Sequence, residues 1–471
     1  MEHRKKYLIK NTALFALGSL GTKLIAFFLV PMYTNVLTTA EYGVVDLVTT
    51  ISNFLAPVMI LNISEAIMRF ALDNGADHDK ILSTGVSIFL GGTVLGLLLI
   101  PLASGFPTIE EYGLYLYFYT ITLAGSQLFL YNLRGREKLL AYSIANIVHA
   151  LSIAVFNIYF LLYAKRGIQG YFIAYILANT ITMIYAFLAG KTWVHLKRFH
   201  LDITLSKEMV AYSVVLIPNS FMWWIINSSD RIMITAMIGA AANGVYAIAY
   251  KIPSLVQTIT NIFNQAWSYS AIRENHSADR DAYSNRIFNG IVAISTMSGV
   301  GLLAIIKVFL RLYVEKSYYH AWKYTPFLMI GYVFLTLASF LATYYTVNKD
   351  SRGFLFSSIC GAAVNLILNA ILIPAIGVSG AALATCISYV AVYAYRIFDT
   401  RKYISIHFLE PKHIAAYCIL LLAGATVFLD NLFGQVALIV EFIVLAGLFK
   451  NDWYPLFCAV WRKVIHREHR G

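Results

Sequence analysis

The sequence predicts an all-α membrane protein of fourteen transmembrane helices, with two six-helix lobes around a central cavity and two further C-terminal helices. Three observations support this prediction. Hydrophobic residues make up 59% of the 471 residues and charged residues only 13%, against about 25% charged residues in a typical soluble domain. Apolar segments recur along the whole chain. Basic residues concentrate in alternate loops, which fixes the orientation of a membrane protein.

Each apolar segment is near the roughly 20 residues that cross a bilayer as a helix. The segments lie near 11–33, 43–72, 81–103, 112–133, 139–163, 168–189, 209–238, 243–272, 285–313, 324–347, 354–373, 378–398, 413–430 and 432–449. The first is longer than the apolar part of a signal peptide, so we expect a retained helix. The predicted parts of the chain are an N-terminal lobe (1–190), a cytoplasmic linker (191–207), a C-terminal lobe (208–400), helices 13 and 14 (401–450) and a basic cytoplasmic tail (451–471).

The net charge of +12 is distributed as a topology signal. If the N-terminus lies in the cytoplasm, almost every short loop rich in Lys and Arg also lies inside, and both termini are cytoplasmic. The predicted exterior loops hold few basic residues: Lys165, Arg166, Lys316 and Lys323. We therefore expect no nucleic-acid partner. The four cysteines lie in or beside apolar runs without paired metal spacing and are predicted to be small buried hydrophobes.

Two sequence matches indicate an internal repeat. Tyr42-Gly43-Val44 and Asn243-Gly244-Val245 each begin a predicted helix, at an offset of 244 − 43 = 201 residues. Gly167-Ile168-Gln169-Gly170 and Gly377-Val378-Ser379-Gly380 do the same, at 377 − 167 = 210. Matches at nearly one offset, both at predicted exterior helix starts, predict a duplicated six-helix unit in parallel orientation.

The stretch from Leu216 to Ser270 places Asp230, Arg231 and Lys251 in or near the hydrocarbon layer. A charge there costs at least about 2.5–3.5 kcal/mol unless it faces a partner or a wet cavity. One helical face from Lys251 onward is polar, at steps of three and four: Lys251, Ser254, Thr258, Asn261, Gln265 and Ser268. This stripe either forms interhelical hydrogen bonds or lines a water-filled path, and we favour the path.

Neighbouring Asp230 and Arg231 point about 100° apart on a helix. Arg231 shares a face with Asn227 and is the better candidate for the cavity, whereas Asp230 is expected to bind another helix, for instance at Lys251. Two further cations leave alternatives open. Lys23 either faces the cavity or pairs with a carboxylate such as Asp46. Arg69 either pairs with Glu65 four residues earlier or leaves it when an anion enters.

A cationic lining would offset the desolvation of a phosphate that crosses the membrane. The candidate substrate-binding residues are Lys23, Arg69, Arg231, Lys251, Asn227, Asn261 and Gln265. The candidate ion-coupling residues are Asp46, Glu65 and Asp230. Glu441, a carboxylate in the last predicted helix, has no assigned role. The sequence contains no Walker loop, HExxH, GxSxG or Cys/His metal spacing. We therefore expect that the protein is not an enzyme and binds no cofactor or metal.

The runs PNSFMWWIINSSDR, NGVYAIAYKIPSL and NQAW, and ISEAIMRF in the second helix, resemble the Wzx-type polysaccharide flippases. Their superfamily also holds the multidrug and toxin extruders and the lipid II flippase. The resemblance implies translocation of an undecaprenyl-pyrophosphate-linked oligosaccharide to the outer leaflet of the bacterial cell membrane by alternating access. It also implies membrane lipids and glycan polymerase machinery as partners. In the lipid II flippase two extra helices form a groove for the lipid tail, which Tyr417, Phe428 and Phe433 would line here.

Three alternatives remain. A drug or metabolite antiporter shares the fold and relies on buried carboxylates, which this sequence has. Lipid II is a second possible substrate. A glycan polymerase or ligase is disfavoured, because the predicted exterior loops leave no room for a catalytic domain.

Overall fold

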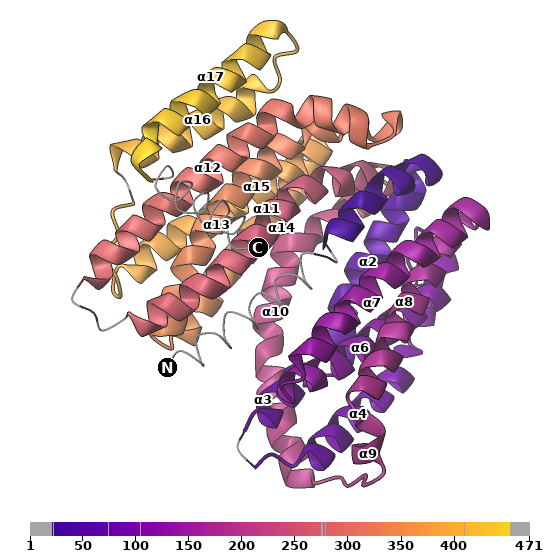
Figure 1. Ribbon diagram of the computed structural model, residues 1–471. Coiled ribbons are helices and arrows are strands. Elements are labelled where there is room, and N and C mark those ends of the chain that lie inside the picture. The colour runs from indigo at the N-terminus through magenta and orange to yellow at the C-terminus, as the bar shows by residue number, and fades with distance from the viewer. Residues whose placement is uncertain are drawn as a thin grey trace, which may run out of the picture. The chain divides into compact units, whose positions relative to one another are not determined.

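The computed structural model describes residues 21, 23–73, 75–103, 105–274, 277, 279–408 and 410–452. This described part is almost entirely helical and contains no strand. It divides into two compact units (Figure 1). The N-terminal unit comprises Met1–Trp224 and Ile238–Gly244, and the C-terminal unit comprises Ile225–Met237 and Val245–Gly471.

In the N-terminal unit, α6 packs against α2, α3 and α8, while α7 packs along α8. A helix over Lys23–Val36 comes first. It is followed by α2 (Thr39–Met59), α3 (Ile63–Ala71), α4 (His78–Gly96), α5 (Leu99–Ala103), the 3-10 turn Glu110–Tyr112, α6 (Gly113–Gly135), α7 (Leu139–Asn157), the π-helical turn Ile158–Tyr163, α8 (Gly167–Ala189) and α9 (Thr192–Leu196). Both α10 (Ile203–Met237) and α11 (Ala240–Arg273) contribute to the two units.

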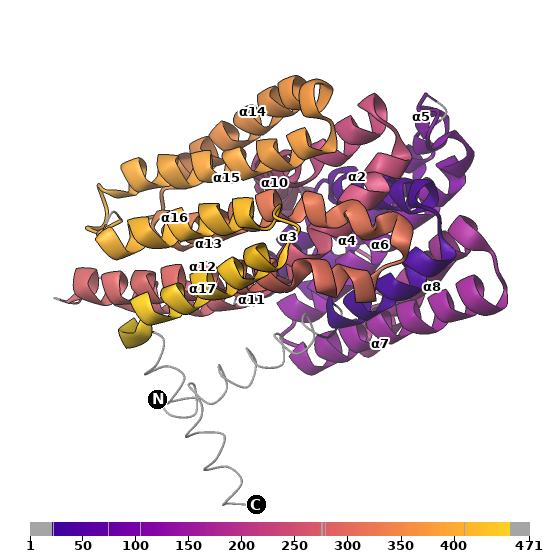
Figure 2. The same cartoon turned by 90° about the horizontal axis from the view of Figure 1, so that it is seen from above.

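In the C-terminal unit, α13 is the most buried span, and α15 packs against both α13 and α14. The elements are α12 (Arg280–Tyr313), the 3-10 segment Lys316–Lys323, α13 (Thr325–Val347), α14 (Ser351–Ile376), α15 (Val378–Thr400), α16 (Pro411–Thr426) and α17 (Leu432–Leu448). The last two helices pack against α12 and against each other (Figure 2). They therefore form an appended pair, as predicted.

The prediction of an all-helical membrane fold is confirmed. Eight described helices are long and apolar enough to cross a membrane, and shorter apolar helices cover Lys23–Val36 and Leu432–Leu448. The remaining predicted segments also fall on helices, which is compatible with fourteen crossings. The prediction of one continuous helix over 43–72 is wrong. The helix breaks after Met59, where Leu61 and Asn62 have φ of 51° and 54°. A left-handed backbone cannot continue a right-handed helix.

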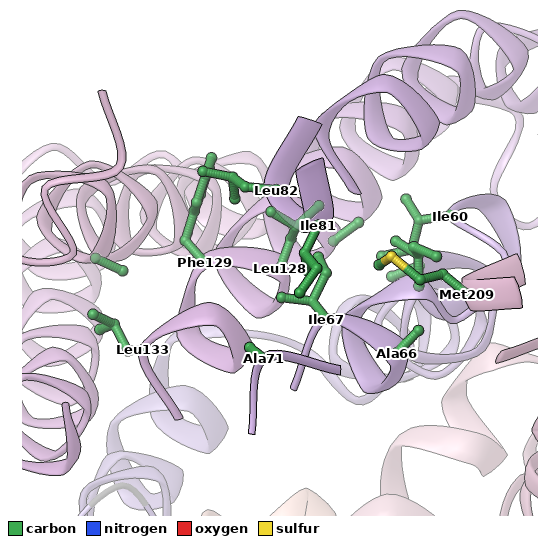
Figure 3. Packing of buried hydrophobic residues seen from close by; sticks show 14 residues of the cluster. Ile60, Ala66, Ile67, Ala71, Ile81, Leu82, Leu128, Phe129, Leu133 and Met209 are labelled. Carbon is green, nitrogen blue, oxygen red and sulfur yellow. The ribbon is translucent and has the colours of Figure 1, made fainter. Parts of the chain in front are cut away.

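The first part of α10 belongs to the core of the N-terminal unit. Met209 is fully buried among Ile60, Ala66 and their neighbours from α3, α4 and α6 (Figure 3). The Trp224 indole stacks on Phe54 with ring centroids 4.4 Å apart and donates a hydrogen bond to the Thr50 carbonyl at 3.2 Å. The boundary between the two compact units therefore falls inside α10, whereas the predicted lobe boundary, drawn from polarity and repeats, lies in 191–207.

Candidate functional site

Asp230 is the most buried charged residue of the predicted site, with no exposed surface. Its carboxylate accepts hydrogen bonds from the Tyr246 hydroxyl of α11 and, at 3.2 Å, from the Thr385 hydroxyl of α15. The backbone amide of Arg231 also donates to it, at 2.9 Å. Asp230 therefore does bind other helices, but through hydroxyl groups rather than through Lys251 as suggested from the sequence.

Polar side chains of α14 extend this network. The Ser229 hydroxyl donates to Asn365 Oδ1 at 2.8 Å, and the Asn369 amide donates to the same oxygen at 2.9 Å. The Asn365 amide lies 3.4 Å from the Thr385 hydroxyl. Asn369 Oδ1 is buried and has no hydrogen-bond partner within the described part of the chain. The site thus gathers a carboxylate, hydroxyls and amide oxygens, which are the ligand types that hard cations prefer.

Asn365, Asn369 and Thr385 were not among the residues predicted from the sequence. A detectable signal was present in the segment NLILN, where two amides four residues apart interrupt an apolar helix. Such a spacing places both side chains on one helical face. Which other helix that face meets depends on tertiary packing, so the residues could be flagged from sequence but not joined to Asp230.

Arg231 and Asn227 lie within one aromatic network, in agreement with the face they were predicted to share. The Arg231 guanidinium carbon lies 4.6 Å from the centroid of the Tyr250 ring. The hydroxyls of Tyr250 and Tyr389 are 3.1 Å apart, and the Tyr389 hydroxyl donates to Asn227 Oδ1 at 2.7 Å. A cation over a ring face is stabilised by the ring quadrupole. Asp230 and Arg231 therefore face different partners although they are neighbours.

The polar stripe on α11 is only partly described. Lys251 is half-buried and Asn261 is exposed, while the side chains of Thr258 and Gln265 lie outside the described part. At the far end of the stripe, Ser268 and Thr343 of α13 share a hydrogen bond of 3.2 Å. That end therefore forms an interhelical hydrogen bond, and the water-filled path stays a prediction for the rest of the stripe.

The N-terminal unit holds Lys23 and Asp46. Lys23 is exposed and, among the described residues, forms no ion pair with Asp46. Asp46 is half-buried on α2, with the amide of Asn243 at 3.5 Å. The same amide donates to the Gly43 carbonyl at 2.9 Å. Of the two alternatives for Lys23, pairing with Asp46 is not observed.

Glu65 and Arg69 do not pair in the manner considered from the sequence. Arg69 is exposed on α3 and forms an ion pair with Asp73. Both pairs have the same i,i+4 spacing, so spacing alone could not decide between them. The broken helix separates Glu65 and Arg69 from the span of α2, which carries Asp46.

The starts of α2 and α11 cross at their two glycines. A Cβ on Gly43 would lie 1.8 Å from the Ala240 carbonyl oxygen, and a Cβ on Gly244 would lie 2.0 Å from the Thr39 carbonyl oxygen. Both distances are far inside van der Waals contact. The repeated Gly-Val motif therefore marks a backbone-to-backbone approach that only glycine permits.

The remaining predictions concern α16 and α17. Glu441 accepts a hydrogen bond from Thr426 at 2.9 Å, whereas Lys412 forms ion pairs with Glu410 and Asp452. Tyr417 shares a hydrogen bond with Tyr393 at 3.1 Å. Phe428 packs against Trp322 and Phe327, and Phe433 is 72% exposed. The predicted tail groove stays a prediction.

Comparison with known proteins assigns the family. Residues 8–269, more than half of the chain, match the family model for polysaccharide biosynthesis proteins. The chain belongs to this polysaccharide biosynthesis family. A curated relative, an uncharacterized membrane protein of Methanocaldococcus jannaschii, is 24% identical over 389 residues, which is 79% of this chain and 70% of the relative.

Solved structures share the fold of this family member. The lipid II flippase MurJ in an inward closed conformation superposes with a TM-score of 0.65 at 15% identity, covering 95% of this chain and all of that one. The Vibrio cholerae MATE transporter VcmN, as a D35N mutant, gives 0.58 at 14% identity over 84% of this chain and 97% of that one. The chain therefore shares the fold of these two transporters, and with its many apolar helices it is a multi-pass membrane protein.

Proposed function

We propose that the protein is a flippase that moves an undecaprenyl-pyrophosphate-linked oligosaccharide repeat unit from the cytoplasmic to the outer leaflet. The observation that carries this proposal is the match to the polysaccharide biosynthesis family over residues 8–269, on a chain whose fold resembles that of a lipid flippase. The mechanism is alternating access, in which two halves of the chain expose a central site first to one side of the membrane and then to the other.

In this mechanism the cations bind the pyrophosphate. Arg231 is held against Tyr250, and Lys23 is exposed on its helix. Lys251, Arg69, Asn227, Asn261 and Gln265 complete the proposed set. The lipid tail stays in the bilayer while the head group crosses, so only the phosphates and sugars require a polar path.

The driving force comes from gradients. Outward movement of negative charge down an inside-negative potential of about 100 mV releases roughly 2.3 kcal/mol per charge. The buried network around Asp230, with the free oxygen of Asn369, is suited to a coupling cation or proton, and it is a stronger candidate than Asp46 or Glu65. The proposed location is the bacterial inner membrane with both termini in the cytoplasm, where glycan polymerase machinery would receive the product.

The test is deletion in the native host, followed by analysis of lipid-linked sugars. We expect these sugars to accumulate and surface glycan to be lost, and the full chain to restore both. Arg231→Ala and Lys23→Ala should fail to restore export while they remain at normal levels in the membrane. Lys316→Ala, an exposed lysine in a predicted exterior loop, is the matched control and should restore export fully.

A drug or metabolite antiporter is the second candidate, because a buried carboxylate such as Asp230 also suits cation exchange and a MATE transporter shares the fold. Drug sensitivity in the deletion strain without any change in lipid-linked sugars would favour it. Accumulation of lipid II alone would instead assign this chain to lipid II flipping.

A further inference from the structure

A groove opens between α4 and the first part of α10, entirely within the N-terminal unit. Its volume is about 710 Å³, within the roughly 300–1,000 Å³ of ordinary ligand pockets. Its walls come from one face of α4, from Leu201 just before α10 and from α10 itself: Thr84, Ser87, Ile88, Leu201, Ile203, Ser206, Lys207, Val210, Ala211, Val214 and Val215. None of these residues belongs to the predicted transport site.

The two helices are joined by polar contacts at one end of the groove. Lys80 and Asp202 form an ion pair of 3.0 Å, and the hydroxyls of Thr84 and Ser206 are 2.8 Å apart. The Lys80 ammonium and the amides at the start of α10 hold the pKa of Asp202 below its usual value. This end is therefore a fixed, charged junction at the predicted membrane surface.

The polarity of the lining changes along the groove. Ser206 and Lys207 lie at the charged end, and Lys207 is exposed without an ion pair among the described residues. Farther along α10 the lining is apolar, with Val214 40% exposed and Val215 75% exposed. We expect these side chains to lie in the hydrocarbon layer, because α10 is long and apolar enough to cross a membrane.

The length of the groove matches one leaflet. The lining of α10 runs from Ile203 to Val215, which is roughly 18 Å at 1.5 Å per residue. Half of a hydrocarbon core of about 30 Å is roughly 15 Å. A cation at the membrane surface followed by an apolar channel one leaflet deep is complementary to an anionic lipid with one acyl chain in the channel. A polyprenyl tail is much longer than this channel.

We propose that the α4–α10 groove binds an anionic membrane phospholipid, with the phosphate at Lys207 and an acyl chain along Val210, Val214 and Val215. The half-buried Ser206 hydroxyl, which is hydrogen-bonded to the fully buried Thr84 hydroxyl, lies beside the expected position of the headgroup. Because α10 continues from this groove into the C-terminal unit, the lipid would brace the helix that carries Arg231. The proposal does not depend on which substrate the protein transports.

The test uses the full chain in phosphatidylcholine vesicles that contain phosphatidylglycerol with a photoreactive diazirine in one acyl chain. After illumination, mass spectrometry should locate adducts in peptides that contain residues 84–88 and 203–215. Lys207→Gln should reduce this labelling about fivefold, since one basic residue near an anionic surface contributes about 1 kcal/mol. Ala211→Trp, which fills the apolar part of the groove, should abolish the labelling.

Two matched controls define the specificity. Lys197→Gln removes an exposed lysine on the same predicted side outside the groove, and Leu151→Trp adds bulk to an exposed face of α7; neither should change the labelling. Equal labelling of groove and α7 peptides, or labelling unaffected by both groove variants, would refute the site. Unlabelled lipids then compete with the probe. If added undecaprenyl phosphate prevents the labelling and unlabelled phosphatidylglycerol does not, the groove binds the substrate tail and the phospholipid proposal is overturned.

Discussion

At the scale of single residues, Asp230 illustrates how a charge is retained inside a membrane protein. Its carboxylate is fully buried, yet hydroxyls from α11 and α15 and one backbone amide all donate to it. An unsatisfied buried carboxylate would be far more costly than one with three donors. The buried Asn369 Oδ1 accepts no hydrogen bond within the described residues, and a bound cation would satisfy this oxygen.

Asp230→Asn is expected to remove cation-dependent stabilisation. In wild type, sodium in place of choline should raise the thermal unfolding temperature, because a ligand at about 100 times its Kd stabilises the folded state by about 2.7 kcal/mol. The variant should show no sodium effect, and its free energy of unfolding should fall by about 1–3 kcal/mol because hydrogen bonds to the carboxylate are broken. Asp46→Asn tests the alternative coupling candidate and should keep the sodium effect. A wild-type protein indifferent to sodium and to pH would contradict a coupling role for Asp230.

Gly43→Ala should destabilise the N-terminal unit. The new methyl group would overlap the Ala240 carbonyl, and overpacking of this kind typically costs about 1–3 kcal/mol. Gly91→Ala is the matched control, because nothing lies within 4 Å of its Cβ position in α4. Thermal unfolding of both purified variants makes the comparison. Equal stability of Gly43→Ala and Gly91→Ala would show that the two helix starts do not approach so closely.

At the scale of elements, periodicity predicted the helices well and their continuity less well. The apolar run over 43–72 hides the break at Leu61 and Asn62, because both residue types also occur within helices and only the left-handed φ values reveal the end. Likewise, i,i+4 spacing was equally compatible with Glu65–Arg69 and Arg69–Asp73 pairs. Short-range patterns fix which residues share a face, whereas the partner of that face is set by packing between distant segments.

The start of α14 offers a prediction about pH. Asp350 caps this helix through the Gly353 amide at 2.9 Å, accepts from the Tyr403 hydroxyl at 2.7 Å and lies 3.2 Å from the Lys402 ammonium. The Gly353 amide first, then Tyr403 and Lys402, lower the pKa of Asp350 to about 2. A carboxyl with a lowered pKa stabilises the fold above its unfolded pKa, near 3.8, and this stabilisation is lost as the pH falls through the folded pKa.

Asp350→Ala should therefore lower the free energy of unfolding by roughly 0.5–2 kcal/mol at neutral pH, the usual contribution of an N-cap. Asp350→Asn keeps a capping side chain, so its free energy of unfolding should fall by less than that of Asp350→Ala. The difference between wild type and Asp350→Asn should persist from neutral pH to about 4 and shrink between about 4 and about 2. Thermal unfolding in detergent across this range is the measurement. A difference that grows on acidification would exclude the proposed role of the ionised carboxylate.

At the scale of the whole molecule, composition and loop charge predicted the membrane fold, and the family match and similar structures agree with it. The boundary between the two compact units could not be predicted from the sequence. It lies inside α10 because Met209 and Trp224 pack with the N-terminal helices. The buried cluster around Asp230 was likewise predicted only in part. Its residues come from α10, α11, α14 and α15 and meet only after folding.

The predicted orientation is the assumption on which export depends, and single cysteines test it. Glu110 and Lys316 are exposed in predicted exterior loops, and His200 and His407 are exposed in predicted interior loops. In a cysteine-free background, a membrane-impermeant maleimide should label Glu110→Cys and Lys316→Cys in intact cells, but His200→Cys and His407→Cys only after the cells are permeabilised. Each half of the chain contributes one site per side, so a reversal confined to one half would also be detected. Labelling of His200→Cys in intact cells would show that the N-terminal half has the opposite orientation. The proposed exporter would then be an importer of its anionic head group.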